Sequence, residues 1–340
     1  MKYLFPLVAV IVLARIAWVG STIPGMQNVF GIDVPYAALI LFIGGFCWRV
    51  VYWAKSPVPF KIPTTCGQGY SMPWVKRDKL EAPVSTGEVV GRMFLEVVFF
   101  RSLWRNTKAD MQPGPVLTYK STRWLWLFGI LFHYSMLVIL LRHLRLFVEP
   151  VPFLISVLDG LDALAFNPTP ELSFYVTDAL ILLGLSALLL RRFLLRPVRY
   201  ISLANDYFPL FLLIGIAISG ISMRYFLRSG VDIIAIKRLA VGLATFNPEI
   251  TTDIAPIFYT HLFLVSCLLA YFPFSKLMHM GGVFMSPTRN MANDSRMKRH
   301  INPWNPDIKP HSYASYEDEF REDMVEQGIP VEKELEKAED

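Results

Sequence analysis

The sequence has too few charged residues and too few cysteines for several classes of protein. Charged residues make up 18% of the 340-residue chain, whereas a soluble globular protein has about a quarter. Disorder of the whole chain is excluded, because it requires low hydrophobicity and 54% of these residues are hydrophobic. The three cysteines (Cys47, Cys66 and Cys267) are an odd number without a C-x-x-C spacing, which excludes a disulfide framework and a cysteine zinc site. A mean hydropathy of +0.41 instead indicates an integral membrane protein.

Six apolar runs are long enough for a helix to cross a hydrocarbon core, which takes about 20 residues. They lie at about 3–20, 35–54, 123–147, 172–194, 206–228 and 255–280. The first run follows Lys2 as a signal peptide would, but Arg15 interrupts it and no small-x-small cleavage site follows, so a retained helix is favoured. We therefore predict an all-α integral membrane protein with a six-helix transmembrane bundle.

Lysine and arginine are concentrated in alternate connections between these runs. Segments 21–34 and 148–171 have none, whereas 55–122 has ten and 281–340 has eight. Because basic residues are retained on the cytoplasmic side, we predict a multi-pass protein of the inner (cytoplasmic) membrane with both termini in the cytoplasm. The net charge of +5 is thereby accounted for without a nucleic-acid partner.

The longest connection, 55–122, is predicted to be a cytoplasmic loop. It contains the turn-rich stretch Cys66-Gly67-Gln68-Gly69 and an amphipathic segment at 88–105, which lies on the membrane surface or under a partner protein. Cys66 is a candidate ligand or redox thiol, although a lone cysteine is more often a small loop residue. The acidic last thirty residues, 311–340, are predicted to be solvated until a partner orders them.

Four of the six histidines lie within or at the ends of predicted transmembrane helices. His133 and His143 are ten residues apart on the third helix, and His261 and His279 are eighteen apart on the sixth. Ionisable groups in a membrane are costly and mark function, and imidazole is a common axial ligand of haem iron. Because the two helices run in opposite directions, His143 pairs with His261 near the outer face and His133 with His279 near the inner face. Two haem b groups are therefore expected; structural histidines are the alternative.

The two spacings do not match on straight helices. A rise of about 1.5 Å per residue separates His133 from His143 by about 15 Å and His261 from His279 by about 27 Å. Tilt, the span of a haem and a kink near Pro273 are expected to absorb the difference.

Charged residues near the predicted outer ends of the helices are candidates for the surroundings of the outer haem. Arg142 and Arg224 are candidate partners for haem propionates, and Arg15 and Asp178 are weaker candidates for a quinone site. Snorkelling of the arginines to lipid headgroups is the competing interpretation.

The four-histidine pattern resembles the gamma subunit of respiratory nitrate reductase, a membrane dihaem cytochrome b. The spacings His-x9-His and His-x17-His match that family's axial ligands. The resemblance implies that His133 and His279 hold the cytoplasm-proximal haem, that His143 and His261 hold the distal one, and that quinol reacts by the distal haem. The resemblance covers a dihaem core at about 35–285. The chain departs from the family in an extra N-terminal helix at 1–34 and in the long cytoplasmic loop 55–122, and a cytoplasmic tail is predicted at 286–340.

The large loop resembles that of the DsrM family of the Dsr membrane complex in microbes that reduce sulfate or oxidise sulfur. The resemblance rests on Pro63-Thr64-Thr65-Cys66-Gly67-Gln68, Leu80-Glu81-Ala82-Pro83, Gly91-Arg92-Met93 and Phe100-Arg101-Ser102-Leu103. It implies a heterodisulfide reductase-like iron–sulfur partner on the cytoplasmic face, a multihaem cytochrome c and other redox subunits. The predicted function is electron exchange with menaquinone or another quinone and relay across the membrane in dissimilatory sulfur metabolism.

Two alternatives stay open. The chain is a cytochrome b subunit of another nitrate reductase-like or heterodisulfide reductase-like complex, or it is a haem-free membrane anchor that recruits soluble redox subunits. The second alternative accounts for the basic loop and the acidic tail but leaves the four histidines unexplained.

Overall fold

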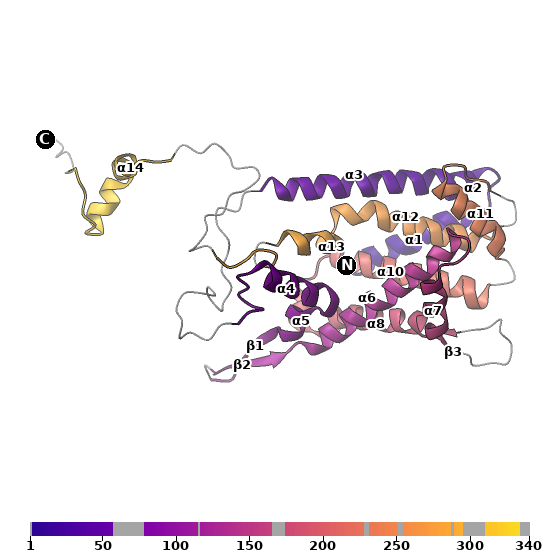
Figure 1. Cartoon of the computed structure of the whole chain (residues 1–340), viewed down its shortest axis with the longest axis horizontal. Coiled ribbons are helices and arrows are strands. Elements are labelled where there is room, and N and C mark those ends of the chain that lie inside the picture. Colours follow the sequence, from indigo (N-terminus) through magenta and orange to yellow (C-terminus); the bar gives the residue numbers. More distant parts are fainter. Residues whose placement is uncertain are drawn as a thin grey trace.

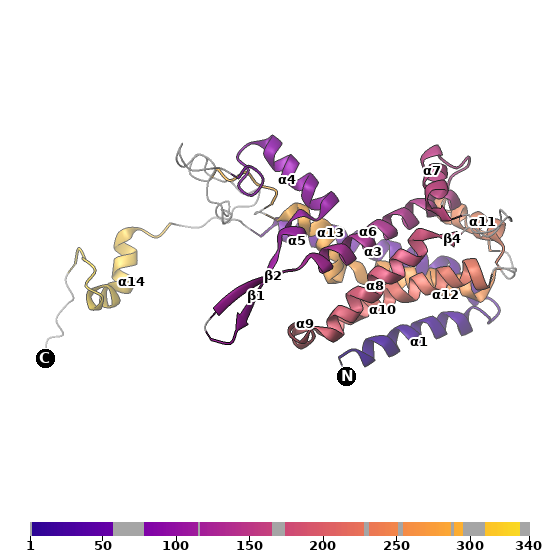
Figure 2. The same ribbon diagram turned by 90° about the horizontal axis from the view of Figure 1, so that it is seen from below.

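Long helices lie side by side in a bundle, and short elements cover its two ends (Figures 1 and 2). The computed structural model describes residues 2–56, 78–114, 116–164, 174–227, 231–250, 254–286, 289–294 and 310–333. The long helices are α1 (Leu4–Gly20), α3 (Val34–Ala54), α6 (Arg123–His143), α8 (Val176–Leu194), α10 (Ala204–Ile221) and α12 (Pro256–Tyr271). The short α2 (Met26–Asn28) and the π-turn η1 (Val29–Asp33) lead into α3.

Within the described residues, four helical stretches are long and apolar enough to cross a membrane: Met26–Ala54, Arg123–Leu146, Ala204–Phe226 and Pro256–Phe274. These four support a multi-pass membrane protein. Helix α1 is apolar but has only 17 residues. Helix α8 carries Asp178 in its first turn and Arg191 and Arg192 in its last. Helices α1 and α8 form as expected, but that they cross the membrane, which would make six crossings, stays a prediction.

Helix α10 lies at the centre of the bundle, where it packs against α1, α8 and α12. Leu212 of α10 is fully buried with Val10 of α1 and Leu264 of α12. Helix α6 packs against α8, whereas α3 packs against α12. The contact between α6 and α8 requires a glycine, because a Cβ atom on Gly184 would lie 2.9 Å from the backbone nitrogen of Phe132.

The sixth predicted helix is broken, which confirms the kink expected near Pro273. Helix α12 ends at Tyr271, and the 3-10 turns η5 (Phe272–Phe274) and η6 (Lys276–Met278) follow it. Ser275, between the turns, has the extended dihedral angles φ −115° and ψ 176°. The short helix α13 (His279–Gly282) then begins at the histidine, and the turn η7 (Val283–Met285) ends the segment.

The elements of the large loop lie at one end of the bundle, which we call the loop end (Figures 1 and 2). They are α4 (Thr86–Phe99), α5 (Arg101–Arg105) and an antiparallel hairpin of β1 (Thr107–Gln112) and β2 (Val116–Ser121), with Thr107 opposite Ser121. The predicted amphipathic segment is thus two helices, because Phe100 between them has a left-handed φ of 51°. Cys66 lies outside the described residues.

Short helices cover the opposite end, which we call the far end (Figure 2). They are α7 (Phe153–Asp162) and α11 (Ile233–Ala244), accompanied by the two-residue strands β3 (Ala163–Leu164) and β4 (Phe174–Tyr175). The remaining elements are η2 (Leu144–Leu146), α9 (Arg196–Ile201), the π-turn η3 (Ser222–Phe226) and α14 (Tyr313–Glu326) in the tail. Within α14, the carboxylate of Glu317 accepts hydrogen bonds from the backbone amides of Glu332 and Lys333, so part of the acidic tail is structured.

Candidate functional site

The four histidines lie in two pairs between α6 and the chain segment that runs from α12 to α13. At the loop end, the ring centres of His133 and His279 are 6.0 Å apart and the ring planes are 82° apart. At the far end, the ring centres of His143 and His261 are 6.4 Å apart and the planes are 10° apart. The break after Tyr271 shortens the path from His261 to His279, so both pairs meet despite their unequal spacing in the sequence.

The Nδ1 atoms of three histidines are engaged by backbone carbonyls. His133 Nδ1 lies 2.7 Å from Gly129 O, His143 Nδ1 lies 2.7 Å from Ile139 O, and His279 Nδ1 lies 2.9 Å from Lys276 O. A carbonyl oxygen only accepts hydrogen bonds, so in each ring Nδ1–H donates. The Nε2 atom of each neutral ring then keeps its lone pair for a metal.

A serine fixes the fourth histidine in the same way. The hydroxyl of Ser219 on α10 donates to Ile216 O at 2.9 Å and lies 3.0 Å from His261 Nδ1. Because the hydroxyl has one proton, which Ile216 accepts, its oxygen accepts the Nδ1–H of His261. All four rings are therefore oriented with Nε2 as the available ligand atom.

The distances between the rings fit a metal ion held by two imidazoles. Two metal–nitrogen bonds of about 2.0 Å, with about 1.1 Å from each nitrogen to its ring centre, place two ring centres about 6 Å apart on opposite sides of one ion. The observed separations are 6.0 Å and 6.4 Å. No group of three or more His, Cys, Asp or Glu side chains forms a metal site in the described part of the chain. Imidazole is a common protein ligand of haem iron, so these residues fit that cofactor.

Small and aromatic residues shape the surroundings of the rings. Phe132 and Phe100 contact His133 edge to face, with ring centres 4.6 Å and 5.0 Å away. Phe100 belongs to the large loop, so the loop touches the loop-end pair directly. At the far-end pair, a Cβ atom on Gly220 would lie 3.2 Å from Cε1 of His261.

Arg142 is held by carboxylates at the far end. Its Nε donates to Asp159 Oδ1 at 3.0 Å and its Nη1 donates to Asp162 Oδ2 at 2.8 Å. Asp178 Oδ1 lies 3.9 Å away, and the guanidinium lies over the ring of Tyr175 with its central carbon 3.2 Å from the ring centre. The guanidinium is therefore neutralised by the protein itself, which weakens the interpretation of Arg142 as a propionate partner.

Arg224 and Asp178 join the same cluster. The guanidinium of Arg224, in the π-turn η3, lies 4.0 Å from the ring centre of Tyr175. Tyr225 donates its hydroxyl hydrogen to Asp178 Oδ2 at 2.7 Å. Three of the charged candidates are thus brought together, whereas Arg15 is exposed on α1 and outside this cluster.

The sequence did not indicate that Asp159 and Asp162 pair with Arg142, nor the roles of Tyr175 and Tyr225. Two aspartates in an otherwise apolar connection were the available signal, because a carboxylate among apolar residues needs a partner. Which partner it has depends on α7, which folds back over the end of α6.

Residues 78–105 and 289–294 form a unit at the loop end, which we call the platform. Glu81 organises it, because its carboxylate accepts hydrogen bonds from Arg101 at 2.6 Å and from Arg105, and its backbone carbonyl accepts one from Arg92 at 3.0 Å. Burial lowers the pKa of Arg92.

Residues 289–294 complete the platform. The backbone amide of Asn293 donates to Pro83 O at 2.5 Å, and Arg289 lies 3.4 Å from Glu96. Three motifs of the large loop (Leu80–Pro83, Gly91–Met93 and Phe100–Leu103) therefore contribute residues to one platform beside His133.

The chain is similar to one protein family and to two characterised relatives. Residues 95–298 match the model of the nitrate reductase gamma subunit family, a range that includes all four histidines but not α1 or α3. An Hdr-like menaquinol oxidoreductase cytochrome b-like subunit of Archaeoglobus fulgidus is 49% identical over 285 residues, which cover 82% of this chain and 84% of the relative. A subunit of the same description from Archaeoglobus profundus is 43% identical over 280 residues, or 80% and 82% of the two chains.

Proposed function

Because the chain belongs to the nitrate reductase gamma subunit family, we propose that it is a membrane dihaem cytochrome b that exchanges electrons with menaquinone and relays them across the membrane. The observation that carries the proposal is the arrangement of two histidine pairs, one at the middle of α6 and one at its last residue, each spaced for one iron held by two imidazoles. The names of the two relatives, which include menaquinol oxidoreductase, support the choice of quinone.

In this mechanism the protein holds the haem groups and orients their histidine ligands. Haem, when bound, supplies the one-electron chemistry. His133 and His279 hold the loop-end group and His143 and His261 the far-end group, each through Nε2. The hydrogen bonds from Nδ1 keep the rings in the required tautomer and make the ligands more basic. His133 and His261 are partly buried between helices, whereas His143 and His279 are exposed in this structure.

We place quinol oxidation at the far end, next to the cluster of charged residues. Oxidation of a quinol releases two protons along with two electrons, so the site needs a proton acceptor. Asp178 is our candidate, because its carboxylate is held by the Tyr225 hydroxyl at 2.7 Å and lies close to Arg142. The structure offers no comparable argument for Arg15.

We place the loop end in the cytoplasm, because the described elements of segment 55–122 lie at this end and the segment contains ten Lys and Arg residues. The platform is then the docking surface for an iron–sulfur partner. Phe100 supports this assignment, since it belongs to the platform and its ring lies 5.0 Å from that of His133. A partner seated on the platform would approach the loop-end pair through this residue. The loop motifs further support a DsrM-like role in dissimilatory sulfur metabolism, with a multihaem cytochrome c among the other subunits.

Mixing the oxidised, purified chain with menaquinol tests the proposal. The expected result is reduction of a b-type haem, followed in its absorption spectrum, and slower reduction in an Asp178→Asn variant. A chain that carries haem but is not reduced by menaquinol would refute the quinol step alone. A chain without haem would favour the haem-free anchor.

A further inference from the structure

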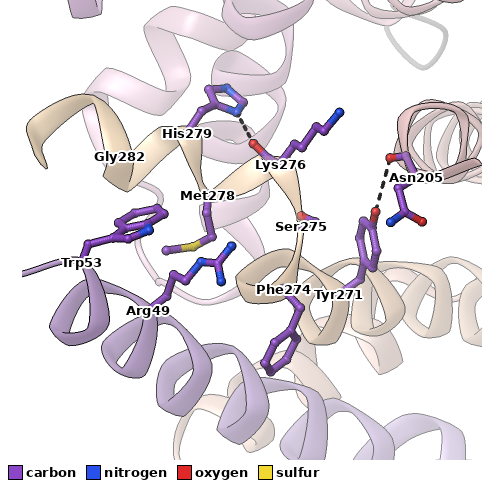
Figure 3. A pocket seen from close by; sticks show the side chains of 10 residues that line it. All are labelled: Arg49, Trp53, Asn205, Tyr271, Phe274, Ser275, Lys276, Met278, His279 and Gly282. Carbon is purple, nitrogen blue, oxygen red and sulfur yellow. Dashed lines mark hydrogen bonds between the residues drawn. The ribbon is translucent and has the colours of Figure 1, made fainter. Parts of the chain in front are cut away.

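A pocket of about 340 Å³ lies at the loop end, between α3 and the broken segment after α12 (Figure 3). Its lining includes Arg49 and Trp53 of α3 and Phe274, Ser275, Lys276 and His279 of the broken segment. The pocket therefore joins a helix outside the matched family range of 95–298 to the segment that carries one of the four histidines.

Arg49 is the unusual residue of this pocket. Its Nε is buried without a hydrogen-bond partner. Its guanidinium also lies near the rings of Trp48 and Trp53, whose centres are 5.9 Å and 5.5 Å from the guanidinium carbon. A guanidinium at the end of a transmembrane helix is costly unless an anion or water solvates it. Lys276 differs, because it donates to Asp206 at 2.6 Å.

The pocket is built for an anion. None of its lining residues, all of which are described, is an aspartate or glutamate. The guanidinium of Arg49 points toward the turn at Ser275, so the two side chains lie on the same side of the pocket (Figure 3). A guanidinium presents a fork of N–H donors that matches the oxygens of a phosphate or carboxylate.

The surroundings of Arg49 favour a lipid phosphate over a haem carboxylate. The ring of His279 points away from Arg49, and the ribbon at Met278 separates them (Figure 3). Trp48, next to Arg49 in the sequence, is 53% exposed, and Phe274 of the pocket lining is 58% exposed. Exposed aromatic side chains at the end of a transmembrane helix mark the membrane interface, and basic pockets between helices at this level bind anionic headgroups.

We propose that Arg49 binds the phosphate of an anionic phospholipid in this pocket, so that the lipid ties α3 to the segment carrying His279. The lipid site itself does not depend on the proposed electron transfer. Its effect on the loop-end haem rests on the proposed function, because that effect requires His279 to be a haem ligand.

The test uses the full-length chain purified in detergent, washed free of lipid and placed in nanodiscs of phosphatidylcholine with increasing phosphatidylglycerol. Native mass spectrometry counts the phosphatidylglycerol molecules that stay bound. We expect one retained lipid that Arg49→Gln weakens about tenfold, since the loss of one charged hydrogen bond is of this size, and that Arg49→Lys partly restores. Lys108→Gln, which removes an exposed cation from the hairpin strand β1, is the matched control and should change nothing.

Three results would overturn the lipid site. Equal lipid retention by wild type and Arg49→Gln would show that Arg49 does not bind it. Displacement of the lipid by millimolar inorganic phosphate would assign the pocket to free anions. Loss of co-purifying menaquinone, rather than of lipid, in the Arg49→Gln variant would assign it to quinone. A monodisperse elution profile verifies that each variant is folded.

A second measurement separates this inference from the proposed function. Phosphatidylglycerol should shift the spectrum of the loop-end haem in wild type but not in Arg49→Gln, and it should leave the far-end haem unchanged. Lipid retention in a chain that binds no haem would keep the lipid site and refute the proposed function. A chain that binds haem but retains no lipid through Arg49 would keep the proposed function and refute the lipid site.

Discussion

The rings of His143 and His261 are nearly parallel, with the ring planes only 10° apart and the centres 6.4 Å apart. The loop-end pair differs, because the rings of His133 and His279 are nearly perpendicular at 82°. The hydrogen bonds from Nδ1 set these orientations through different partners, a serine hydroxyl for His261 and a backbone carbonyl for His279. The two candidate sites therefore have the same ligands but different ligand orientation.

This difference in orientation predicts two distinguishable signals in electron paramagnetic resonance of the oxidised protein. Parallel imidazole planes split the two iron dπ orbitals and give a rhombic low-spin signal, whereas perpendicular planes leave these orbitals nearly degenerate and give a highly anisotropic one. We expect one signal of each kind in equal amounts. Two identical rhombic signals would contradict the geometry of the loop-end pair.

The close approach of α6 and α8 predicts that Gly184→Ala destabilises the bundle. The new Cβ would lie 2.9 Å from the backbone nitrogen of Phe132, which cannot rotate away as a side chain would. Overpacking of this kind costs about 1–3 kcal/mol, so the thermal unfolding midpoint in detergent should fall. The control is Gly44→Ala, where nothing lies within 4 Å of the added Cβ. Equal midpoints for the two variants would show that the helices separate without cost.

The ion pairs at the far end predict that Arg142 and Arg145 contribute unequally to stability. Arg142→Gln leaves Asp162 without its cationic partner and Asp159 with Arg145 alone, and breaking a buried pair costs about 3–5 kcal/mol. Arg145 also pairs with Asp159, but its side chain is 39% exposed, so Arg145→Gln should cost about 1 kcal/mol or less. Thermal unfolding of the two variants side by side measures the difference. Destabilisation of the same size in both would mean that Arg142 is not the buried partner.

Glu317 predicts a pH dependence of the tail helix α14. The backbone amide of Glu332, followed by that of Lys333 and the side chain of Arg321, lowers the pKa of Glu317 by hydrogen bonding to its carboxylate. A lowered folded-state pKa contributes stability above the ordinary glutamate pKa of about 4.3, and this stability is lost as pH falls through the folded-state value. Hydrogen exchange, corrected for intrinsic rates, should show protection of residues 313–326 at pH 7 that is lost under acid.

The matched variants for this prediction are Glu317→Gln and Glu322→Gln. Glu317→Gln should be weakly protected at every pH, because the charged acceptor is gone. Glu322 is exposed on the same helix, so Glu322→Gln should behave as wild type. An unchanged acid response in Glu317→Gln would assign the pH dependence to another group.

Much of the bundle follows from the sequence, because apolar runs of membrane length leave few choices of structure. Each predicted run contains a helix, and the opposite directions of the third and sixth runs paired the four histidines by depth as they lie in the structure. Pro273 indicated where the last helix breaks. Whether α1 and α8 cross the membrane is less predictable, because α1 is short and α8 carries charged residues in its first and last turns.

Contacts between segments that are distant in the sequence could not be predicted from it. The hairpin of β1 and β2 is a polar stretch without alternating hydrophobicity, so its pattern did not indicate strands. Glu81 and Arg92 belong to two separate loop motifs in the sequence. Only the structure shows that they interact, because Arg92 donates a hydrogen bond to the Glu81 carbonyl within the platform. Arg142 was assigned to a propionate because α7, which supplies Asp159 and Asp162, cannot be positioned from its sequence.

The most direct measurement is haem quantification with a reduced-minus-oxidised spectrum of wild type, His143→Ala and the control His311→Ala. His311 lies near the acidic tail helix, 3.9 Å from Glu319, so its replacement should change nothing. We predict two b-type haems per chain in wild type and in His311→Ala, and one in His143→Ala, with the far-end signal absent. No haem in the folded wild type, or loss of both haems from a folded His143→Ala variant, would contradict the account.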